Sequence, residues 1–242
     1  MFVHSNETTG QEVTCEPLGE GGALVTLARE MGRAAHERVR AWCVQLEHER
    51  WRGLIEYVPA YTTVALFFDP LIVDYAEIRA AALRLAQQTT SVREEASCVV
   101  EIPVCYDGEF GPDLEHVARH HGISTDRVIR IHESGEYEVW MLGFAPGFAY
   151  LGGLSERIAT PRHATPRVSV PAGSVGIAGG QTGVYPFESP GGWQLIGRTP
   201  LRMFDPERSP AALLAPGDRV RFRAIAREEF DTIRSSVGAQ RG

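Results

Sequence analysis

The sequence predicts an α+β protein: a small α/β domain of the split βαβ kind, residues 1–95, followed by a β-barrel domain, residues 96–242. Apolar residues recur at helical spacing in two stretches of the first part, between short strand-like runs. The second part carries Gly or Pro every few residues between short strands, which is typical of barrels. Hydrophobic residues make up 43% of the 242 residues, enough to build a core.

The first part alternates strands and helices. In order, the expected elements are two short strands around the turn 19–22, a helix within 28–50, strands at 54–58 and 62–68, a helix over 74–88, and another strand near Cys98. Pro59 separates the middle strands, because proline cannot donate to a sheet ladder. Asp74 and Glu77 have the spacing of a capping box. The polar segment 90–97 lacks periodicity, and we place the domain boundary there.

The second part opens and closes with strands and carries short helices between them. In order, we expect a strand in "VVEIPV", a helix in "GPDLEHVARHHG", a helix in "STDRVIRIHES", a run of short strands from "YEVWMLGF" onward, a closing strand in "GDRVRFRAI", and a terminal helix in "REEFDTIRSSV". In the closing strand, Val220, Phe222 and Ala224 alternate with arginines, which predicts one apolar face.

The charged residues exclude several kinds of site. The net charge is −7, and a chain without a basic run is a poor candidate for nucleic-acid binding. All 24 basic residues are arginine, so a Walker-A lysine, a Schiff-base lysine and a lysine general base are all excluded. Any phosphate site would depend on backbone N–H groups and arginines.

The four cysteines and the N-terminal segment predict a cytoplasmic protein with reduced thiols. Cys15, Cys43, Cys98 and Cys105 form no CxxC pair. The first ten residues lack the basic and apolar regions of a signal peptide, and no window reaches 18 apolar residues. We expect no membrane association. A nucleophilic role for Cys98 or Cys105 is the less favoured interpretation, because buried free cysteine is the common state beside a strand.

Four segments concentrate glycine, proline, aromatic residues and arginine. They are "GFAPGFAYLGGL", "TPRHATPRVSVPAGSVGIAGGQTG", "YPFESPGGW" and "IGRTP". Glycine lets a backbone approach a ligand closely, and Arg162, Arg167 and Arg198 have the geometry to clamp a carboxylate or phosphate. Barrel corners also need Gly and Pro, so composition alone does not separate a pocket wall from a set of turns.

Histidines and loop carboxylates give weaker candidates. His116 and His120 stand at i and i+4 on one predicted helix, a spacing that can share a metal, although a solvated face is the favoured interpretation. Asp107 and Glu109 either cap the helix that follows or serve as a general base, and capping is favoured. His132 is either a core histidine or a polar group at the mouth of the barrel.

The motifs together are specific enough to point to a family. The strings "IPVCYDGEFGPDLEHVA", "GFAPGFAYLGGL" and "TPRVSVPAGSVGIAGGQTGVYPFESPGGWQLIGRTPLRMFDP" resemble the family of 5-oxoprolinase B subunits, also described as allophanate hydrolase subunit 1. The similarity is dense over 102–206. It is looser but in order over the first domain, where "YVPAYTTVALFFDP" matches the pattern.

The resemblance implies a cyclophilin-like β-barrel after the small α/β domain. It also implies assembly with homologues of the 5-oxoprolinase C subunit and A subunit into a hetero-oligomer. With these partners the family opens the lactam of 5-oxo-L-proline to L-glutamate at the expense of ATP, for which Mg²⁺ is the expected companion ion. We therefore expect part of a hydrolase whose ligands are a small-molecule lactam and ATP, with no metal-binding residue of its own.

The residues expected to form the site come mainly from the matched motifs. The catalytic candidates are His132, Arg167 and Gln181. The residues expected to line the substrate and ATP pocket are Gly143, Phe144, Pro146, Gly147, Phe148, Tyr150, Arg162, Pro171, Gly173, Gly180, Thr182, Tyr185, Pro190, Gly192, Trp193 and Arg198.

Two other functions compete with this one. Members of the family also inhibit sporulation histidine kinases, which would make the chain a protein-binding module. The older family name suggests a component of an allophanate or urea-derivative amidohydrolase, although a Ser-rich amidase motif is absent from the sequence. A P-loop or Rossmann nucleotide site is disfavoured, because neither glycine fingerprint is present.

Overall fold

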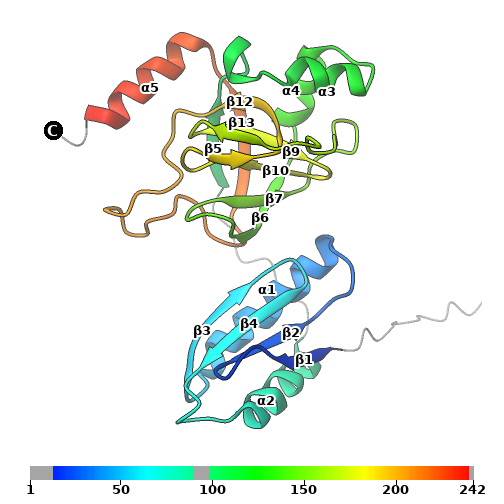
Figure 1. Cartoon of the computed structure of the whole chain (residues 1–242), viewed down its shortest axis with the longest axis vertical. Helices are drawn as coiled ribbons and strands as arrows, with labels where there is room; N and C mark the ends of the chain where they lie inside the picture. The colour runs from blue at the N-terminus through cyan, green and yellow to red at the C-terminus, as the bar shows by residue number, and fades with distance from the viewer. Residues whose placement is uncertain (1–12, 90–98, 240–242) are drawn as a thin grey trace, which may run out of the picture. The chain divides into compact units, whose positions relative to one another are not determined.

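The fold divides into two compact units, Met1–Glu95 and Ala96–Gly242 (Figure 1). The structure is a computed structural model that describes residues 13–89 and 99–239. The segment 90–97, where the sequence places the boundary, lies outside the described residues, as does Cys98. Both units mix helices with antiparallel strands, which confirms the predicted α+β class.

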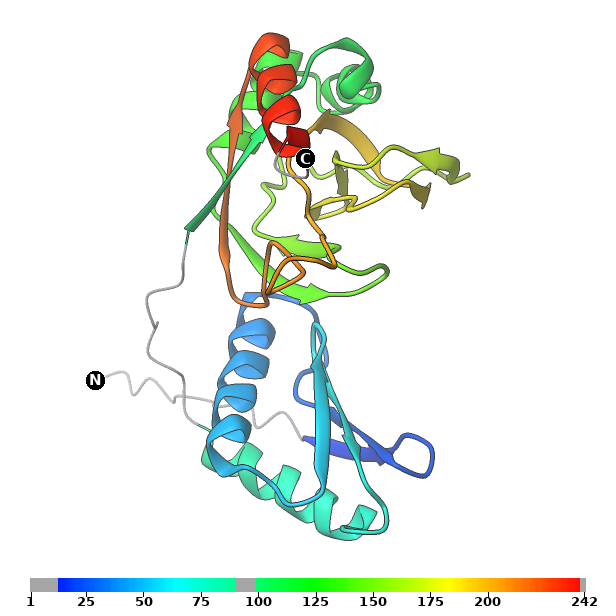
Figure 2. The same cartoon turned by 90° about the vertical axis from the view of Figure 1, so that its left-hand side faces the viewer.

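The first unit is a four-stranded antiparallel sheet with both of its described helices on one face (Figure 2). Its elements are β1 (Thr14–Pro17), β2 (Gly22–Thr26), α1 (Arg33–Glu49), β3 (Leu54–Pro59), β4 (Thr63–Phe68) and α2 (Tyr75–Gln88). The strand order is β1-β2-β4-β3, so two hairpins pair through β2 and β4. The core lies between the sheet and the helices, where Trp42 and Ile78 pack with Val25 and Val64.

Local signals in the sequence specify the ends of these elements. Asp74 accepts a hydrogen bond from the Glu77 N–H, and the Glu77 side chain accepts from the Asp74 N–H, which confirms the predicted capping box. Gly53 follows α1 with a φ of +78°, and a Cβ there would lie 2.7 Å from Val73 Cγ1. Only glycine fits this bend without strain or a clash.

The second unit is a barrel-like sheet with a small ribbon and flanking helices. Its elements are β5 (Val99–Val104), the 3-10 turn η1 (Gly108–Phe110), α3 (Leu114–His120), α4 (Thr125–Glu133), β6 (Tyr137–Leu142), β7 (Ala149–Gly152), β8 (Arg167–Val170), β9 (Ser174–Ala178), β10 (Gln181–Val184), β11 (Ser189–Gly191), β12 (Gln194–Arg198), β13 (Arg219–Ala224) and α5 (Arg227–Ala239). The seven-stranded sheet runs β12-β9-β10-β7-β6-β13-β5, and β8 pairs with β11 in the ribbon.

The barrel closes through a single bridge between its edge strands. Cys105, directly after β5, and Arg198, the last residue of β12, exchange two backbone hydrogen bonds of 2.8 Å each. The strand expected near Cys98 after α2 is β5, and it belongs to this barrel, where it pairs in parallel with β13. The predicted alternation of β13 holds for Val220 and Phe222, which are buried, and ends at Ala224, which is exposed.

Helices α3 and α4 lie side by side at one end of the barrel (Figures 1 and 2). Leu114 and Val117 of α3 and Val128 and Ile131 of α4 belong to the same hydrophobic core as the barrel strands. Ser124 caps α4 by accepting from the Arg127 N–H. Among the residues that the structure describes, no helix is both long and apolar enough to cross a bilayer.

The prediction that Asp107 and Glu109 cap α3 is wrong. The Glu109 carboxylate instead accepts from Arg227 of α5, at 2.7 Å. The guanidinium of Arg227 also lies over the Phe110 ring, 4.4 Å from its centroid. These contacts attach α5 to the turn after β5, where Phe110 packs on Phe230. Glu109 lies in the 3-10 turn η1, and no side chain of the described residues caps the start of α3.

His132 is part of the barrel core. Its Nδ1 lies 2.7 Å from the Tyr106 hydroxyl and its Nε2 lies 3.1 Å from the Thr182 hydroxyl. Because Thr182 donates its own proton to the Gly176 carbonyl, Nε2 must carry the proton and Nδ1 must accept from Tyr106. The imidazole also stacks on Phe222, with ring centroids 4.4 Å apart. The ring is fully buried with both nitrogens used, so the geometry favours a core histidine over a catalytic one.

Burial lowers the pKa of His132 to about 3. The unfolded chain binds a proton at this residue below its ordinary pKa of about 6.5, whereas the folded chain does not. The free energy of unfolding therefore falls by about 1.4 kcal/mol per pH unit as the pH drops from 6.5 toward 3. We expect His132→Gln to remove this dependence, measured by chemical denaturation between pH 7 and 5.

His48→Gln, at an exposed histidine of α1, is the matched control for the chemistry of the substitution. If His132→Gln does not fold, NMR titration of the unmodified protein gives the same information. The His132 ring should stay neutral down to pH 5. Titration of that ring near pH 6.5 would contradict the assignment.

Candidate functional site

The glycine- and proline-rich motifs bring together five aromatic side chains in the second unit, which we call the aromatic rim: Phe144, Phe148, Tyr150, Tyr185 and Trp193. The Phe148 ring is central, with its centroid 4.8 Å from that of Tyr150, 5.3 Å from Tyr185 and 5.6 Å from Trp193. Phe144 adds an edge contact to Phe148 at 5.4 Å. The structure thus joins two motifs that lie some forty residues apart in the sequence.

The loop between β6 and β7 holds Phe144 in a strained conformation. The Phe148 N–H donates to the Ala145 carbonyl across a turn in which Pro146 is followed by Gly147 at a φ of +79°. Before it, the Ala145 N–H donates to the Gly143 carbonyl at 2.7 Å, which closes a γ-turn centred on Phe144. Phe144 has a φ of +66°, and its side chain is 63% exposed. A left-handed conformation costs a residue with a Cβ about 1–2 kcal/mol.

Asp113 connects helix α3 to the rim. This residue is only 5% exposed, and its Oδ1 accepts from Arg167 Nη2 at 2.7 Å. Its Oδ2 accepts from the Leu195 N–H at 2.7 Å, and its own N–H donates to the Leu195 carbonyl at 2.9 Å. Arg167 also reaches the Trp193 carbonyl at 3.5 Å, and His163 Nε2 lies 3.3 Å from Asp113 Oδ2.

The Asp113 carboxylate is held in its ionised form. Burial alone would raise the pKa of this carboxyl, but hydrogen bonds from Arg167, from the Leu195 N–H and from His163 outweigh it and lower the pKa. No sequence pattern singles out Asp113, because its position suggests an ordinary helix cap. Its side chain makes no cap hydrogen bond, and only the fold shows that it faces β12.

Arg162 is the guanidinium that stays available beside the rim. Among the described residues it has no hydrogen bond or ion pair, whereas Arg167 is engaged with Asp113. Burial raises the pKa of Tyr150, and the positive charge of Arg162 acts in the opposite direction, which places that charge near the hydroxyl. The next residue, His163, donates its N–H to the Gly192 carbonyl at 2.7 Å, so the segment is attached next to Trp193.

The other predicted site residues shape the backbone around the rim. Gly143, Pro146 and Gly147 form the β6–β7 loop, Pro171 and Gly173 precede β9, Gly180 precedes β10, Pro190 lies in β11 and Gly192 precedes β12. Gly173 has a φ of +81°, and a Cβ there would lie 2.4 Å from the Thr199 carbonyl oxygen.

Three predicted site residues belong to the barrel strands. Arg198 donates from Nε to the Ala172 carbonyl, and its backbone closes the barrel. Gln181 begins β10 opposite Ala178, and Thr182 lies in the core beside His132.

Four histidines gather along α3 and the neighbouring loop. The rings of His116 and His120 lie 6.3 Å apart between centroids, and those of His116 and His163 lie 6.4 Å apart. His121 reaches the Thr160 hydroxyl at 3.2 Å. Within residues 13–89 and 99–239, no group of three or more His, Cys, Asp or Glu side chains has a geometry that could hold a metal ion.

The three described cysteines, Cys15, Cys43 and Cys105, are free and buried. Burial raises the pKa of Cys43 to about 12 and raises that of Cys105 as well. Since a thiolate is the reactive form, neither environment favours a nucleophile.

Comparison with known proteins identifies the family. The family model "Carboxyltransferase domain, subdomain C and D" matches residues 13–214. The chain is 44% identical over 225 residues to the 5-oxoprolinase B subunit of Bacillus subtilis, covering 89% of this chain and 94% of the relative. The chain belongs to the family of 5-oxoprolinase B subunits. The resemblance drawn from the sequence motifs is therefore confirmed.

Solved structures of other proteins share the fold. The crystal structure of TTHA0988 is 38% identical with a TM-score of 0.73, and the match covers 85% of this chain but only 40% of that longer one. The urea amidolyase of Kluyveromyces lactis has a TM-score of 0.78 over 93% of this chain and 15% of its own. At 21% identity, this second likeness shows the fold alone. The fold of this family thus also occurs within larger chains.

Backbone strain at Phe144 can be measured by comparing two truncations. Alanine keeps the left-handed strain and glycine releases it, so Phe144→Gly should be about 1 kcal/mol more stable than Phe144→Ala. At Phe187, an exposed aromatic residue outside the left-handed region, the order should reverse, because glycine loses more chain entropy than alanine. Denaturant titration of the four variants decides the matter. An alanine variant at least as stable as the glycine variant at 144 would contradict the strain.

Proposed function

We propose that this chain is the B subunit of an ATP-dependent 5-oxoprolinase complex, which opens 5-oxo-L-proline to L-glutamate together with homologues of the A and C subunits. The observation that carries the proposal is the identity of 41–44%, over 85–89% of this chain, to relatives named as 5-oxoprolinase B subunits. A protein named as one subunit of an enzyme works with other chains, which supports assembly with partners. The work of the whole complex is a hydrolysis.

The aromatic rim has the chemistry to hold the lactam. The substrate combines a small, flat, largely apolar ring with one carboxylate. Tyr150 and Trp193 are half-buried and offer rigid faces to such a ring, and their ring centroids lie 5.8 Å apart. Arg162 supplies a guanidinium for the carboxylate, and such charge-assisted pairs are the stronger class of hydrogen bond. In this proposal Arg162 binds the carboxylate and the aromatic rings orient the lactam.

Of the three catalytic candidates, we now propose structural or positioning roles for two. His132 stabilises the core through Tyr106 and Thr182, and its neutral ring is not accessible. Arg167 positions the Trp193 segment through Asp113 and is not free to hold a substrate anion. Gln181 stays a candidate contact at the start of β10, and Gln181→Ala in the assembled complex would test it.

The rim alone is a poor fit for the triphosphate of ATP. A triphosphate needs several cations or backbone N–H groups, whereas the rim offers Arg162, and the chain has no lysine. We therefore propose that the nucleotide phosphates and their Mg²⁺ contact other residues of the complex. ATP would supply the activation of the amide oxygen, while the rim residues hold and orient the lactam.

A second candidate function follows from exposed apolar side chains. Phe144, Val168 and Phe187 are 63%, 90% and 39% exposed, and the last two belong to the ribbon of β8 and β11 and the turn before it. Such side chains are suited to a protein contact, which the histidine-kinase inhibitor function would need. Inhibition of kinase autophosphorylation by this chain without its 5-oxoprolinase partners would favour that function.

The enzyme proposal is tested with the assembled complex. Co-expressed with the A and C homologues from the same genome, the complex should hydrolyse ATP in response to 5-oxoproline. Arg162→Gln should raise the KM for 5-oxoproline about tenfold or more, because it removes the cation for the carboxylate. Arg157→Gln, at an exposed arginine five residues earlier in the sequence, is the control and should leave KM unchanged. The absence of stimulation with all three proteins present would remove the proposal.

A further inference from the structure

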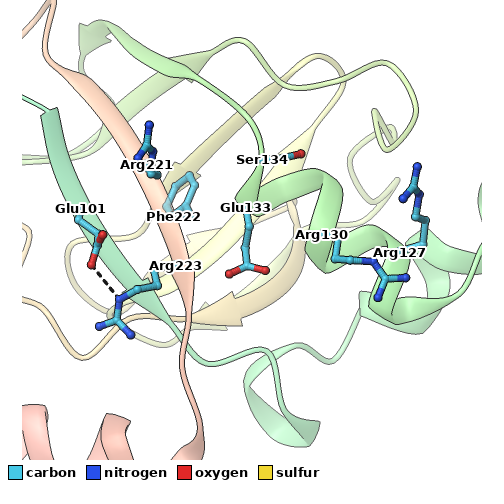
Figure 3. Close-up of a pocket in the computed structure, with 8 residues that line it drawn as sticks. All are labelled: Glu101, Arg127, Arg130, Glu133, Ser134, Arg221, Phe222 and Arg223. Atoms are coloured by element: carbon cyan, nitrogen blue, oxygen red, sulfur yellow. Dashed lines mark hydrogen bonds and ion pairs between the residues drawn. The ribbon is translucent and has the colours of Figure 1, made fainter.

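A hollow lies beside helix α4 and strand β13 (Figure 3). Its volume is about 580 Å³, and it lies along α4 and β13 with one residue from β5. The residues that line it are Glu101, Arg127, Arg130, Glu133, Ser134, Arg221, Phe222 and Arg223. It shares no residue with the rim.

Both carboxylates of this hollow already have partners. Glu101 accepts from Arg223 Nε at 2.8 Å, and Arg223 also donates to Glu229 at 2.9 Å. Glu133 Oε1 accepts from the Ala224 N–H at 2.6 Å, at the end of β13. Glu101 is therefore paired with an arginine, whereas Glu133, bonded to a neutral N–H, keeps its negative charge in the hollow.

Three exposed guanidiniums of the hollow lack a partner within the described part of the chain: Arg127 and Arg130 on α4, and Arg221 on β13. Four arginines against two carboxylates leave this hollow positively charged, on a chain whose net charge is −7. Grouping unpaired cations has an electrostatic cost, which an anionic ligand would offset.

The arrangement of the arginines defines the kind of anion. In Figure 3, Arg127 and Arg130 extend from the helix on one side and Arg221 extends from the strand on the other, with Glu133 between them. Their guanidiniums do not converge on one point, so a single compact anion would not contact both sides. We propose that the hollow binds a small molecule with two separated anionic groups, phosphoryl or carboxylate, one group to α4 and one to β13.

Such a ligand would connect two elements of the barrel core. Phe222 lines the hollow and stacks on His132, which is on α4. Binding to both elements would stabilise the folded chain by mass action. The proposal assigns a role that does not depend on 5-oxoproline or ATP.

Pyrophosphate and succinate are suitable probes, measured by isothermal titration at constant ionic strength in chloride. We expect saturable binding of at least one, about tenfold or more tighter than inorganic phosphate or acetate, respectively. Arg130→Gln combined with Arg221→Gln should weaken that binding about tenfold or more, since it removes one charged donor from each side. The matched control, Arg52→Gln with Arg157→Gln, changes the net charge equally and should bind as the unmodified protein does.

Each outcome bears on the proposal. Binding of pyrophosphate alone would assign a phosphoryl ligand, and binding of succinate alone a dicarboxylate. The proposal fails if neither probe saturates, if the single-group anion binds equally well, or if the Arg130/Arg221 variant keeps its affinity. Far-UV circular dichroism checks that the variants are folded. We expect them to be, because the replaced side chains are exposed.

Discussion

The buried carboxylate of Asp113 is the contact on which the arrangement of the aromatic rim depends. It receives Arg167 of β8 at one oxygen and the Leu195 N–H of β12 at the other, and so joins two strand segments to the start of α3. A buried charge is tolerated only when it is paired and hydrogen-bonded, and this one is both. Loss of Arg167 would leave the buried carboxylate without its ion-pair partner.

The position of the rim follows from that contact. Arg167 reaches from Asp113 to the carbonyl of Trp193, and Trp193 packs on Phe148 and Tyr150. With Arg167 engaged in this way, Arg162 is left as the cation beside the aromatic rings. The fold thus separates a positioning arginine from an available one, although both belong to the same motif.

Local features of the fold could be predicted from the sequence, and long-range contacts could not. The capping box at Asp74 depends on residues within one turn, and this prediction is confirmed. The closure of the barrel joins Cys105 to Arg198, which no local pattern encodes. His132 is polar by type, yet it lies on α4 next to the buried Ile131, and only the tertiary partners Tyr106 and Thr182 show how it is satisfied.

The site shows the same division. The motifs predicted the aromatic residues of the rim, because glycine, proline and aromatic side chains are concentrated there. They did not predict Asp113, whose partners Arg167 and Leu195 lie 54 and 82 residues further along the chain. They selected Arg167 as a catalytic candidate and Arg162 as a pocket residue, and they did not show that Arg167 is engaged by Asp113, because that contact arises on folding.

A double-mutant cycle on Asp113 and Arg167 tests the central claim most directly. The free energy of unfolding is measured for the unmodified protein, for Asp113→Asn, for Arg167→Gln and for the double variant. If the pair holds β8 and β12 as described, the two substitutions should be coupled by about 1 kcal/mol or more, and the double variant should lose less than the sum of the single losses. Losses that add to within about 0.5 kcal/mol would contradict the account.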